Sequence, residues 1–250
     1  MNQLLDVPTD WHEHFFTAPA NLFWERMMPA ESAATDMPFI LRMLGPTSGH
    51  VVLDIGCGTG RHARALASAG RSVIGIDSSP DAIERTNAVL TNNVRFVQAD
   101  VRDLPELPPC EGAIWMGNGF NYFDDADTVK ALQAVHHRLL PGSRLVIQCY
   151  SAAESVFPLA ATERETGFPG GSYGAQMQYD CLTSRLITQA KLTLDGNVHD
   201  LVFAHHIRTT GEMVSQLEEA GFGPVDLFAD VNEQPFAPGS QQLLLVATAR

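Results

Sequence analysis

Three aspartates, each at or just after the end of an apolar run, could together bind a polar ligand. Asp54 closes the run 51–53, and Asp77 and Asp100 follow two later runs. Because the carboxyl ends of parallel strands meet at one edge of a sheet, we expect the three carboxylates to lie close together. A carboxylate accepts hydrogen bonds from two hydroxyl groups and pairs with positive charge. A single acid of this kind is usually a helix cap or a solvated turn, whereas three at successive strand ends indicate a binding site.

A glycine-rich segment follows the first of these acids directly. Residues 54–60 read Asp-Ile-Gly-Cys-Gly-Thr-Gly, and a helix-forming segment begins at Arg61. Glycine adopts positive φ without strain and lets a ligand approach the backbone. A strand, a glycine-rich turn and a helix in succession form a nucleotide-type site at the helix N-terminus, although such a turn can also simply connect the two elements. The spacing differs from the Gly-x-Gly-x-x-Gly of dinucleotide-binding enzymes, and Asp54 would repel a pyrophosphate.

The elements that position these residues alternate between strand and helix. This alternation predicts a parallel sheet with right-handed crossovers. We expect strands over 51–54, 72–77, 94–98, 112–116 and 143–148, and helices over 61–69, from 80 to about Leu90, and over 125–140.

The pattern changes after residue 150. Alternating segments over 176–179, 186–194 and 199–208 predict an antiparallel insertion, and Asp195-Gly196 is a hairpin-turn signal within it. Thr209 and Glu212 have the spacing of a capping box that opens a helix ending at Gly221. Strands over 225–229 and 242–248 then complete the main sheet.

We therefore predict an α/β fold, a Rossmann-like seven-stranded, mostly parallel sheet with helices on both faces. Residues 1–45 are rich in aromatic side chains and form either helices packed on the main domain or a helical lid over the site. The predicted division is a lid at 1–45, a ligand-binding core at 46–149, an antiparallel insertion that caps the substrate at 150–208, and the rest of the core sheet at 209–250.

The charge and composition of the chain limit the classes of function that we expect. The 250 residues carry a net charge of −13, from 29 acidic and 16 basic side chains, so a nucleic-acid partner is not expected. Four scattered cysteines predict neither a zinc site nor a disulfide framework. Residues 1–6 lack the basic start of a signal peptide, and no apolar run approaches the ~20 residues of a membrane span. We expect a cytoplasmic protein.

The segment 54–60 resembles motif I of the class I S-adenosylmethionine (SAM) methyltransferases. The resemblance extends well over about residues 22–150 and loosely over the C-terminal strands. It implies that motif I holds the methionine part of SAM, that Asp77 binds the ribose hydroxyls, and that Asp100 and the Val101 backbone read the adenine. A tryptophan against the cofactor, as in glycine and small-amine N-methyltransferases, would be Trp24. The implied cofactor-binding residues are Trp24, Asp54, Gly56, Cys57, Gly58, Gly60, Asp77, Ser78, Asp100, Val101, Gly117 and Asn118.

The loop 117–122 follows the fourth strand, where methyl donor and acceptor should meet. Its sequence Gly-Asn-Gly-Phe-Asn-Tyr lacks the Asn/Asp-Pro-Pro-Tyr segment of DNA and protein-glutamine methyltransferases, and resembles the loops of small-molecule methyltransferases. His205 and His206 point to opposite faces of a strand, so at most one faces the site. The candidate catalytic residues are His12, Asn118, Tyr122 and His205, and the candidate substrate-binding residues are Trp11, Phe15, Phe16, Phe120, Arg164 and Tyr179.

The resulting prediction is a SAM-dependent methyltransferase that modifies a nitrogen or oxygen of a small molecule, such as an aromatic N-heterocycle, by in-line displacement. The alternatives are a non-catalytic protein that binds SAM or its product S-adenosylhomocysteine (SAH), and a protein or nucleic-acid methyltransferase. A metal-dependent mechanism through Asp124-Asp125 is a further alternative, and the favoured prediction includes no metal. We expect a small-molecule methyl acceptor as partner, no membrane association, and a monomer or homodimer.

Overall fold

The core is a twisted seven-stranded sheet in the order β10-β11-β5-β4-β1-β2-β3. The computed structural model describes residues 5–89, 91–159 and 163–250. Neighbouring strands are parallel except for β11, which runs antiparallel to both β5 and β10. This confirms the predicted fold class. The strands are β1 (Val51–Ile55), β2 (Ser72–Asp77), β3 (Val94–Gln98), β4 (Cys110–Trp115), β5 (Leu139–Cys149), β10 (Phe222–Phe228) and β11 (Leu243–Ala249).

Helices cover both faces of this sheet because its central strands are apolar on both sides. Leu53 of β1 faces a core shared with α6 and α8, whereas Val52 faces a core shared with α3 and α4. The helices are α3 (Ala33–Leu44), α4 (Arg61–Ser68), α5 (Pro80–Asn87), α6 (Asp125–His136), α7 (Ala153–Leu159) and α8 (Thr210–Glu219), with 3-10 turns η1 (Ala30–Ser32), η2 (Val101–Asp103) and η3 (Gly119–Asn121). No helix in the described ranges is long and apolar enough to cross a membrane.

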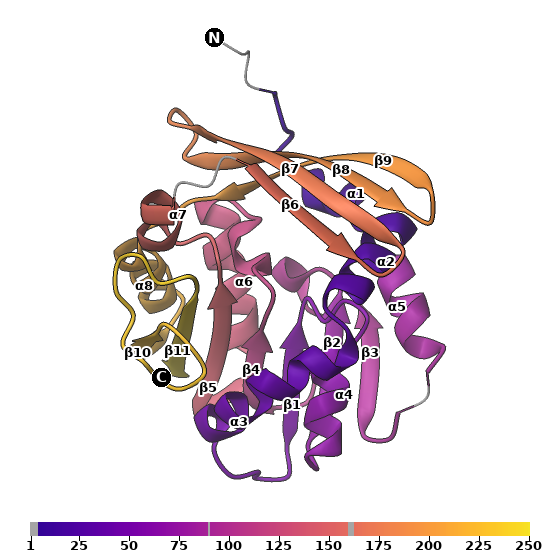
Figure 1. The fold of residues 1–250 in the computed structure, drawn as a ribbon. Helices are drawn as coiled ribbons and strands as arrows, with labels where there is room; N and C mark the ends of the chain where they lie inside the picture. The colour runs from indigo at the N-terminus through magenta and orange to yellow at the C-terminus, as the bar shows by residue number, and fades with distance from the viewer. Residues whose placement is uncertain (1–4, 90, 160–162) are drawn as a thin grey trace.

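A second, four-stranded antiparallel sheet stands over the carboxyl edge of the core sheet (Figure 1). We call it the insertion sheet, and it consists of β6 (Glu163–Phe168), β7 (Gly171–Asp180), β8 (Arg185–Leu194) and β9 (Asn197–His206). Asp195 and Gly196 both have positive φ in the turn between β8 and β9, as the sequence predicts. Two short helices, α1 (Trp11–Phe15) and α2 (Ala18–Met27), lie beneath this sheet.

The N-terminal region divides differently from the prediction. Helix α3, assigned to the lid, carries Phe39 and Ile40 on an apolar face that is buried against the core strands. The aromatic segment beneath the insertion sheet therefore comprises α1 and α2, and α3 is a core helix. The capping box of α8 is confirmed, because Thr209 and Glu212 each bond the other's backbone N–H.

Two boundaries differ from the prediction for a physical reason. Helix α6 ends at His136, not at residue 140, because Leu139 pairs with Cys110 and already belongs to β5. Pro141-Gly142, a pair typical of a helix end, lies within the exposed start of β5, which was predicted to begin only at residue 143. Strand β6 was not predicted, since its residues are mostly exposed and show no apolar alternation. The predicted helix end at Leu90 lies outside the described residues, and α5 spans Pro80–Asn87.

Candidate active site

The glycine loop between β1 and α4 adopts the backbone conformation that requires glycine. Gly56, Gly58 and Gly60 have φ values of 61°, 53° and 80°. A Cβ on Gly60 would lie 2.6 Å from Phe96 Cζ, so this glycine allows close packing of the loop on β3. A Cβ on Gly58 would meet no described atom within 4 Å. The space beside the Gly58 backbone is therefore open, and a ligand can approach the loop there.

Asp54 lies beneath this loop with one carboxylate oxygen unpartnered. Its side chain is buried, at 2% exposure, and Oδ2 has no hydrogen-bond partner among the described residues. Burial raises its pKa to about 7, against the opposing charge of Arg61. An unpartnered buried carboxylate oxygen is unfavourable unless a donor reaches it. This oxygen fits the ammonium group of the implied cofactor.

Asp77 ends β2 and is bonded to the backbone on both sides. Gly58 N donates to its Oδ2 at 2.8 Å, and Ser79 N donates to its Oδ1 at 2.9 Å. Burial raises its pKa above the ordinary value. Each carboxylate oxygen has two acceptor positions, so one on each remains for a hydroxyl group. The carbonyl of Ser78 accepts a bond from Gln98 Nε2 at 3.3 Å.

Asp100, the third acid, has a strong partner that was not predicted. Both of its oxygens accept hydrogen bonds from Arg102, the shorter at 2.6 Å. Arg102 also binds Glu13 of α1 and Asp127 of α6, each at 2.7 Å. Val101 is buried at the start of η2. Asp100 already accepts hydrogen bonds from Arg102, so the amino group of an adenine would be an additional donor to this carboxylate.

The loop after β4 uses its polar side chains mainly to hold itself in place. Asn118 Oδ1 accepts from Tyr150 N at 2.8 Å, and Asn118 Nδ2 donates to Ser151 Oγ at 2.8 Å. The Asn118 amide thus joins the loop to the end of β5, and its second N–H and second lone pair are still available to an acceptor. A Cβ on Gly117 would meet no described atom within 4 Å, as at Gly58. The prediction that Phe120 binds the substrate is wrong, since its fully buried ring packs on Trp115 in the core.

Rings from three distant segments meet at one place, which we call the aromatic cluster. Tyr122 of the loop after β4 lies 5.0 Å from Trp11 of α1 and 5.4 Å from His205 of β9, measured between ring centroids. These contacts join the N-terminal segment, the loop and the insertion sheet. The cluster consists of Trp11, His12, Phe15, Phe16, Tyr122, Phe203 and His205.

The titratable rings of the cluster are neutral. Burial lowers the pKa of His205 to about 4, and burial together with Arg102 lowers that of His12. Burial and the nearby Asp77 raise the pKa of Tyr122 well above its usual range, so its phenol stays protonated. At neutral pH the cluster therefore offers imidazole nitrogens that accept a proton or hydrogen bond, and one phenol that donates.

The other two predicted substrate-binding residues lie on the same face of the insertion sheet as His205. Tyr179 is opposite Leu186, which is opposite His205, and residues directly opposite in antiparallel strands share a face. Arg164 is on this face too, through its pairing with Ala175. Tyr179 contacts Phe157 rather than the cluster, with ring centroids 5.0 Å apart.

Trp24 does not point inward. Its side chain is 41% exposed, while Phe23 beside it stacks on Tyr173 of the insertion sheet at 4.9 Å. Neighbouring helix residues differ by about 100° in direction, so both cannot face the same side. In this structure the inward aromatic residue of α2 is Phe23.

Asp124 and Asp125 have structural roles that account for their position. Asp124 caps α6 by accepting from Asp127 N, and Asp125 binds Arg208 at 2.8 Å. Arg208 is 4% exposed and also donates to Phe123 O at 2.8 Å, which holds the loop that carries Tyr122. No local sequence pattern indicates the roles of Arg208 and Arg102, because their partners Asp125, Glu13 and Asp127 are distant in the chain.

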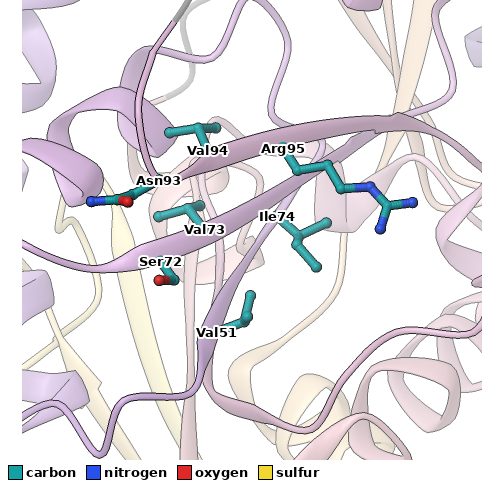
Figure 2. A pocket seen from close by; sticks show the side chains of 7 residues that line it. All are labelled: Val51, Ser72, Val73, Ile74, Asn93, Val94 and Arg95. Carbon is teal, nitrogen blue, oxygen red and sulfur yellow. The ribbon is translucent and has the colours of Figure 1, made fainter.

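A hollow of about 380 Å³ lies between α1 and the start of α5. It is lined by His12, Phe16 and Ser78, among others, so it borders the predicted cofactor residues. Another hollow, of about 300 Å³, lies at the opposite, amino ends of β1, β2 and β3, where Figure 2 shows its mainly apolar lining and Arg95. The second hollow is remote from the three acids and is not part of the site.

Comparison with known proteins agrees with this geometry. Residues 52–142 match the family model of a methyltransferase domain. The cypemycin N-terminal methyltransferase from Streptomyces sp is 31% identical over 111 residues, which are 44% of this chain and 45% of that protein. The chain spans less than half the length of this and several other curated relatives.

Solved structures share the fold at low sequence identity. The CcbJ methyltransferase from Streptomyces caelestis superposes with a TM-score of 0.74 and 20% identity, over 89% of each chain. The sugar N-methyltransferase KedS8 from Streptoalloteichus sp ATCC 53650 gives a TM-score of 0.72 at 18% identity, over 100% of this chain and 97% of that chain. The second similarity takes in the N-terminal helices and the insertion sheet as well as the core.

Proposed function

We propose that this chain is a class I SAM-dependent methyltransferase that transfers a methyl group from SAM to a nitrogen of a small molecule. The observation that carries this proposal is the aromatic cluster, which places neutral histidines of the lid and the insertion sheet over the loop after β4. The acceptor would enter at this cluster, beneath the insertion sheet.

The residues at the carboxyl edge fit SAM. Asp54 offers an unpartnered oxygen to the ammonium group, Asp77 keeps acceptor positions for the ribose hydroxyls, and Gly58 leaves open backbone for the methionine part. When bound, SAM supplies an electrophilic methyl group on a sulfonium sulfur. Neutral side chains around that position add no repulsion to the sulfonium charge.

The cluster can support the transfer by positioning the acceptor and by accepting a hydrogen bond from it. The acceptor nitrogen uses its lone pair to form the new N–C bond, and the electrons of the broken C–S bond stay on sulfur, which leaves SAH. The methylated nitrogen then loses a proton to solvent, because His205, with a pKa lowered to about 4, is too weak a base to take it from an ammonium group. Much of the rate enhancement of such a displacement comes from alignment and exclusion of water, which the lid and the insertion sheet would provide.

Nitrogen is favoured over oxygen by two observations. The relatives and structural neighbours include the cypemycin N-terminal methyltransferase and the sugar N-methyltransferase KedS8. In addition, histidines with a pKa as low as about 4 are weak bases, and an amine needs less base assistance than an alcohol. The net charge of −13 favours a neutral or cationic small molecule over a nucleic acid.

The test is a radiolabelled-methyl screen of the full chain against amino sugars, peptide N-termini, N-heterocycles and phenols. We expect label on amines. Label on phenols alone would overturn the choice of nitrogen, and SAM binding without label on any acceptor would indicate a non-catalytic binding protein.

A pair of adjacent variants then tests the site. His205→Phe removes the neutral imidazole at the cluster, and we expect kcat to fall roughly 10- to 100-fold, with SAM affinity changed less than about twofold. His206→Phe is the matched control, because His206 points to the other face of β9. Equal losses in the two variants would remove His205 from the reaction and indicate a general effect on the insertion sheet.

A further inference from the structure

Arg208 is a buried arginine at the point where the chain returns from the insertion sheet to the core. It lies just after the end of β9 and is 4% exposed. Its backbone pairs in parallel with Ala152, where the chain leaves the core, and its carbonyl accepts from Ala153 N at 2.8 Å. Glu154 Oε1 in turn accepts from Thr210 N at 3.0 Å. These bonds fasten the two ends of the insertion to each other.

The side chain of Arg208 bonds to one short segment of the chain after β4. Its Nε donates to Asp125 Oδ1 and its Nη2 to Phe123 O, each at 2.8 Å. Its Nη1 donates to Asn121 Oδ1 at 3.4 Å, which is a longer and weaker bond. The three acceptors bracket Tyr122 along the chain. One planar guanidinium therefore holds the segment that carries the Tyr122 ring.

The acceptors of Arg208 are themselves held in place. Asn121 is fully buried, and its Nδ2 donates to Cys149 Sγ at 3.0 Å. Asp125 Oδ1 also accepts from Gln216 Nε2 of α8 at 2.9 Å. Within the described part of the chain, Asp125 is the one carboxylate that pairs with Arg208. A lysine would keep the positive charge, but its single ammonium lacks the fork of donors that reaches three separate acceptors.

The two rings that meet at the aromatic cluster lie on either side of this connection. His205 lies shortly before Arg208 in the chain, and Tyr122 lies within the segment that Arg208 binds. Their ring centroids are 5.4 Å apart. Because the rings belong to different elements, their relative position depends on how β9 is joined to the loop after β4.

We propose that Arg208 is a positioning residue for methyl transfer. By holding the segment around Tyr122 against the end of β9, it sets Tyr122 relative to His205 at the place where the acceptor would bind. This inference rests on the proposed function and extends it to a residue that acts through other residues. A misplacement of about 1 Å can lower the rate of an aligned reaction about 100-fold.

The test compares two buried arginines at the same end of the insertion sheet. For Arg208→Lys we expect kcat to fall about 10- to 100-fold, with SAM affinity by calorimetry changed less than about twofold. Arg185→Lys is the matched control, because Arg185 is 7% exposed and opposite His206 but donates to Val7 O at 2.8 Å instead of to the loop. Its kcat should stay within about twofold of the unmodified chain. Equal losses of kcat in the two variants would overturn the inference.

The NMR resonance of the His205 ring Cε1–H gives a readout that is independent of activity. It is assigned by its absence in His205→Phe. The rings of Tyr122 and Trp11 lie near enough to shift it through ring currents, so it reports their relative position. We expect it to move in folded Arg208→Lys and not in Arg185→Lys, whereas a purely stabilising role would leave it unchanged.

An unchanged His205 resonance in folded Arg208→Lys would overturn the inference. If the unmodified chain methylated no acceptor, the proposed function would fail, and this resonance would still decide whether Arg208 positions the two rings.

Asp125→Ala covers the case in which Arg208→Lys does not fold. The Asp125 side chain is 84% exposed, so its truncation should leave the fold intact while removing the acceptor of Arg208 Nε. We expect the His205 resonance to move and kcat to fall about 3- to 10-fold, because two of the three bonds to the segment remain. An unchanged resonance together with unchanged kcat in this variant would contradict the positioning role.

Discussion

Asp54 illustrates the conflict between stability and binding at a single residue. Its carboxyl is buried under the glycine loop, with Oδ2 unpartnered among the described residues, and its pKa is raised to about 7. An aspartate in the unfolded chain has a pKa of about 3.9. The ionised form therefore costs folding free energy in the absence of a ligand, and a cationic ligand removes that cost.

We predict that Asp54→Asn is more stable than the unmodified chain at pH 7.5 without ligand, by about 1–3 kcal/mol. The sign follows from the raised pKa. Between pH 4 and 7 the folded chain binds a proton that the unfolded chain has released, so the stability of the unmodified chain relative to Asp54→Asn falls as pH rises through this window. Above pH 7 the difference levels off. Urea unfolding at pH 4.5, 6 and 7.5 measures it.

The same variant should lose SAM affinity at least tenfold, because an amide does not neutralise the ammonium group. A constant stability difference from pH 4.5 to 7.5 would show that Asp54 is ionised in the folded chain throughout, contrary to the structure.

Residue positions set by local backbone needs were predictable, and those set by distant partners were not. Gly56, Gly58 and Gly60 were predictable because positive φ in a tight loop demands glycine. Arg102 was not, because Glu13 and Asp127 reach it from other elements. The bonds of Asn118 to Tyr150 and Ser151 were not predictable either, because both partners come from the end of β5.

At the scale of elements, α1 is fastened to the core by charge as well as by aromatic packing. Glu13 binds Arg102, which also binds Asp100, the acid predicted to face the adenine. Arg102 stacks on Phe123, 5.0 Å from the ring centroid. Helix α1 and Asp100 are therefore both bound by the guanidinium of Arg102.

We predict that Glu13→Gln loosens α1 and speeds SAH release up to about fivefold, since an exposed ion pair contributes up to about 1 kcal/mol. Stopped-flow tryptophan fluorescence can follow release because Trp11 lies on α1. Added salt should raise the rate of the unmodified chain toward that of the variant. Glu25→Gln is the control, because Glu25 pairs with Arg85 on α5 at 3.5 Å and does not contact Arg102. Equal rates in the two variants would contradict the role of the Glu13–Arg102 pair.

Elements with strong local signals were predicted well. The capping box located α8, and Asp195-Gly196 located the β8–β9 turn. Strand β6 has no apolar alternation and is defined by its pairing with β7, which no local pattern shows. The start of β5 was missed because Pro141-Gly142 is typical of a helix end, whereas pairing of Leu139 with Cys110 places the strand there.

At the scale of the molecule, the two sheets contribute different residues to the candidate site. The core sheet brings Asp54, Asp77 and Asp100 to one edge, and the insertion sheet places His205 over the loop after β4. The first arrangement follows from strand order, so the sequence predicts it through the alternation of strands and helices. The second arrangement depends on how α1 and β9 pack on Tyr122. The sequence indicated which side chains were candidates for the site, but not that they are in contact.

Calorimetric titration of the full chain and of Asp77→Asn with SAM tests the cofactor site most directly, after circular dichroism has shown that both proteins are folded. We predict one SAM site per chain, and at least tenfold weaker binding in Asp77→Asn, because an amide accepts fewer hydrogen bonds from the ribose. Absence of SAM binding by the folded, unmodified chain, or equal affinity in the two proteins, would contradict the assignment of the carboxyl edge as the cofactor site.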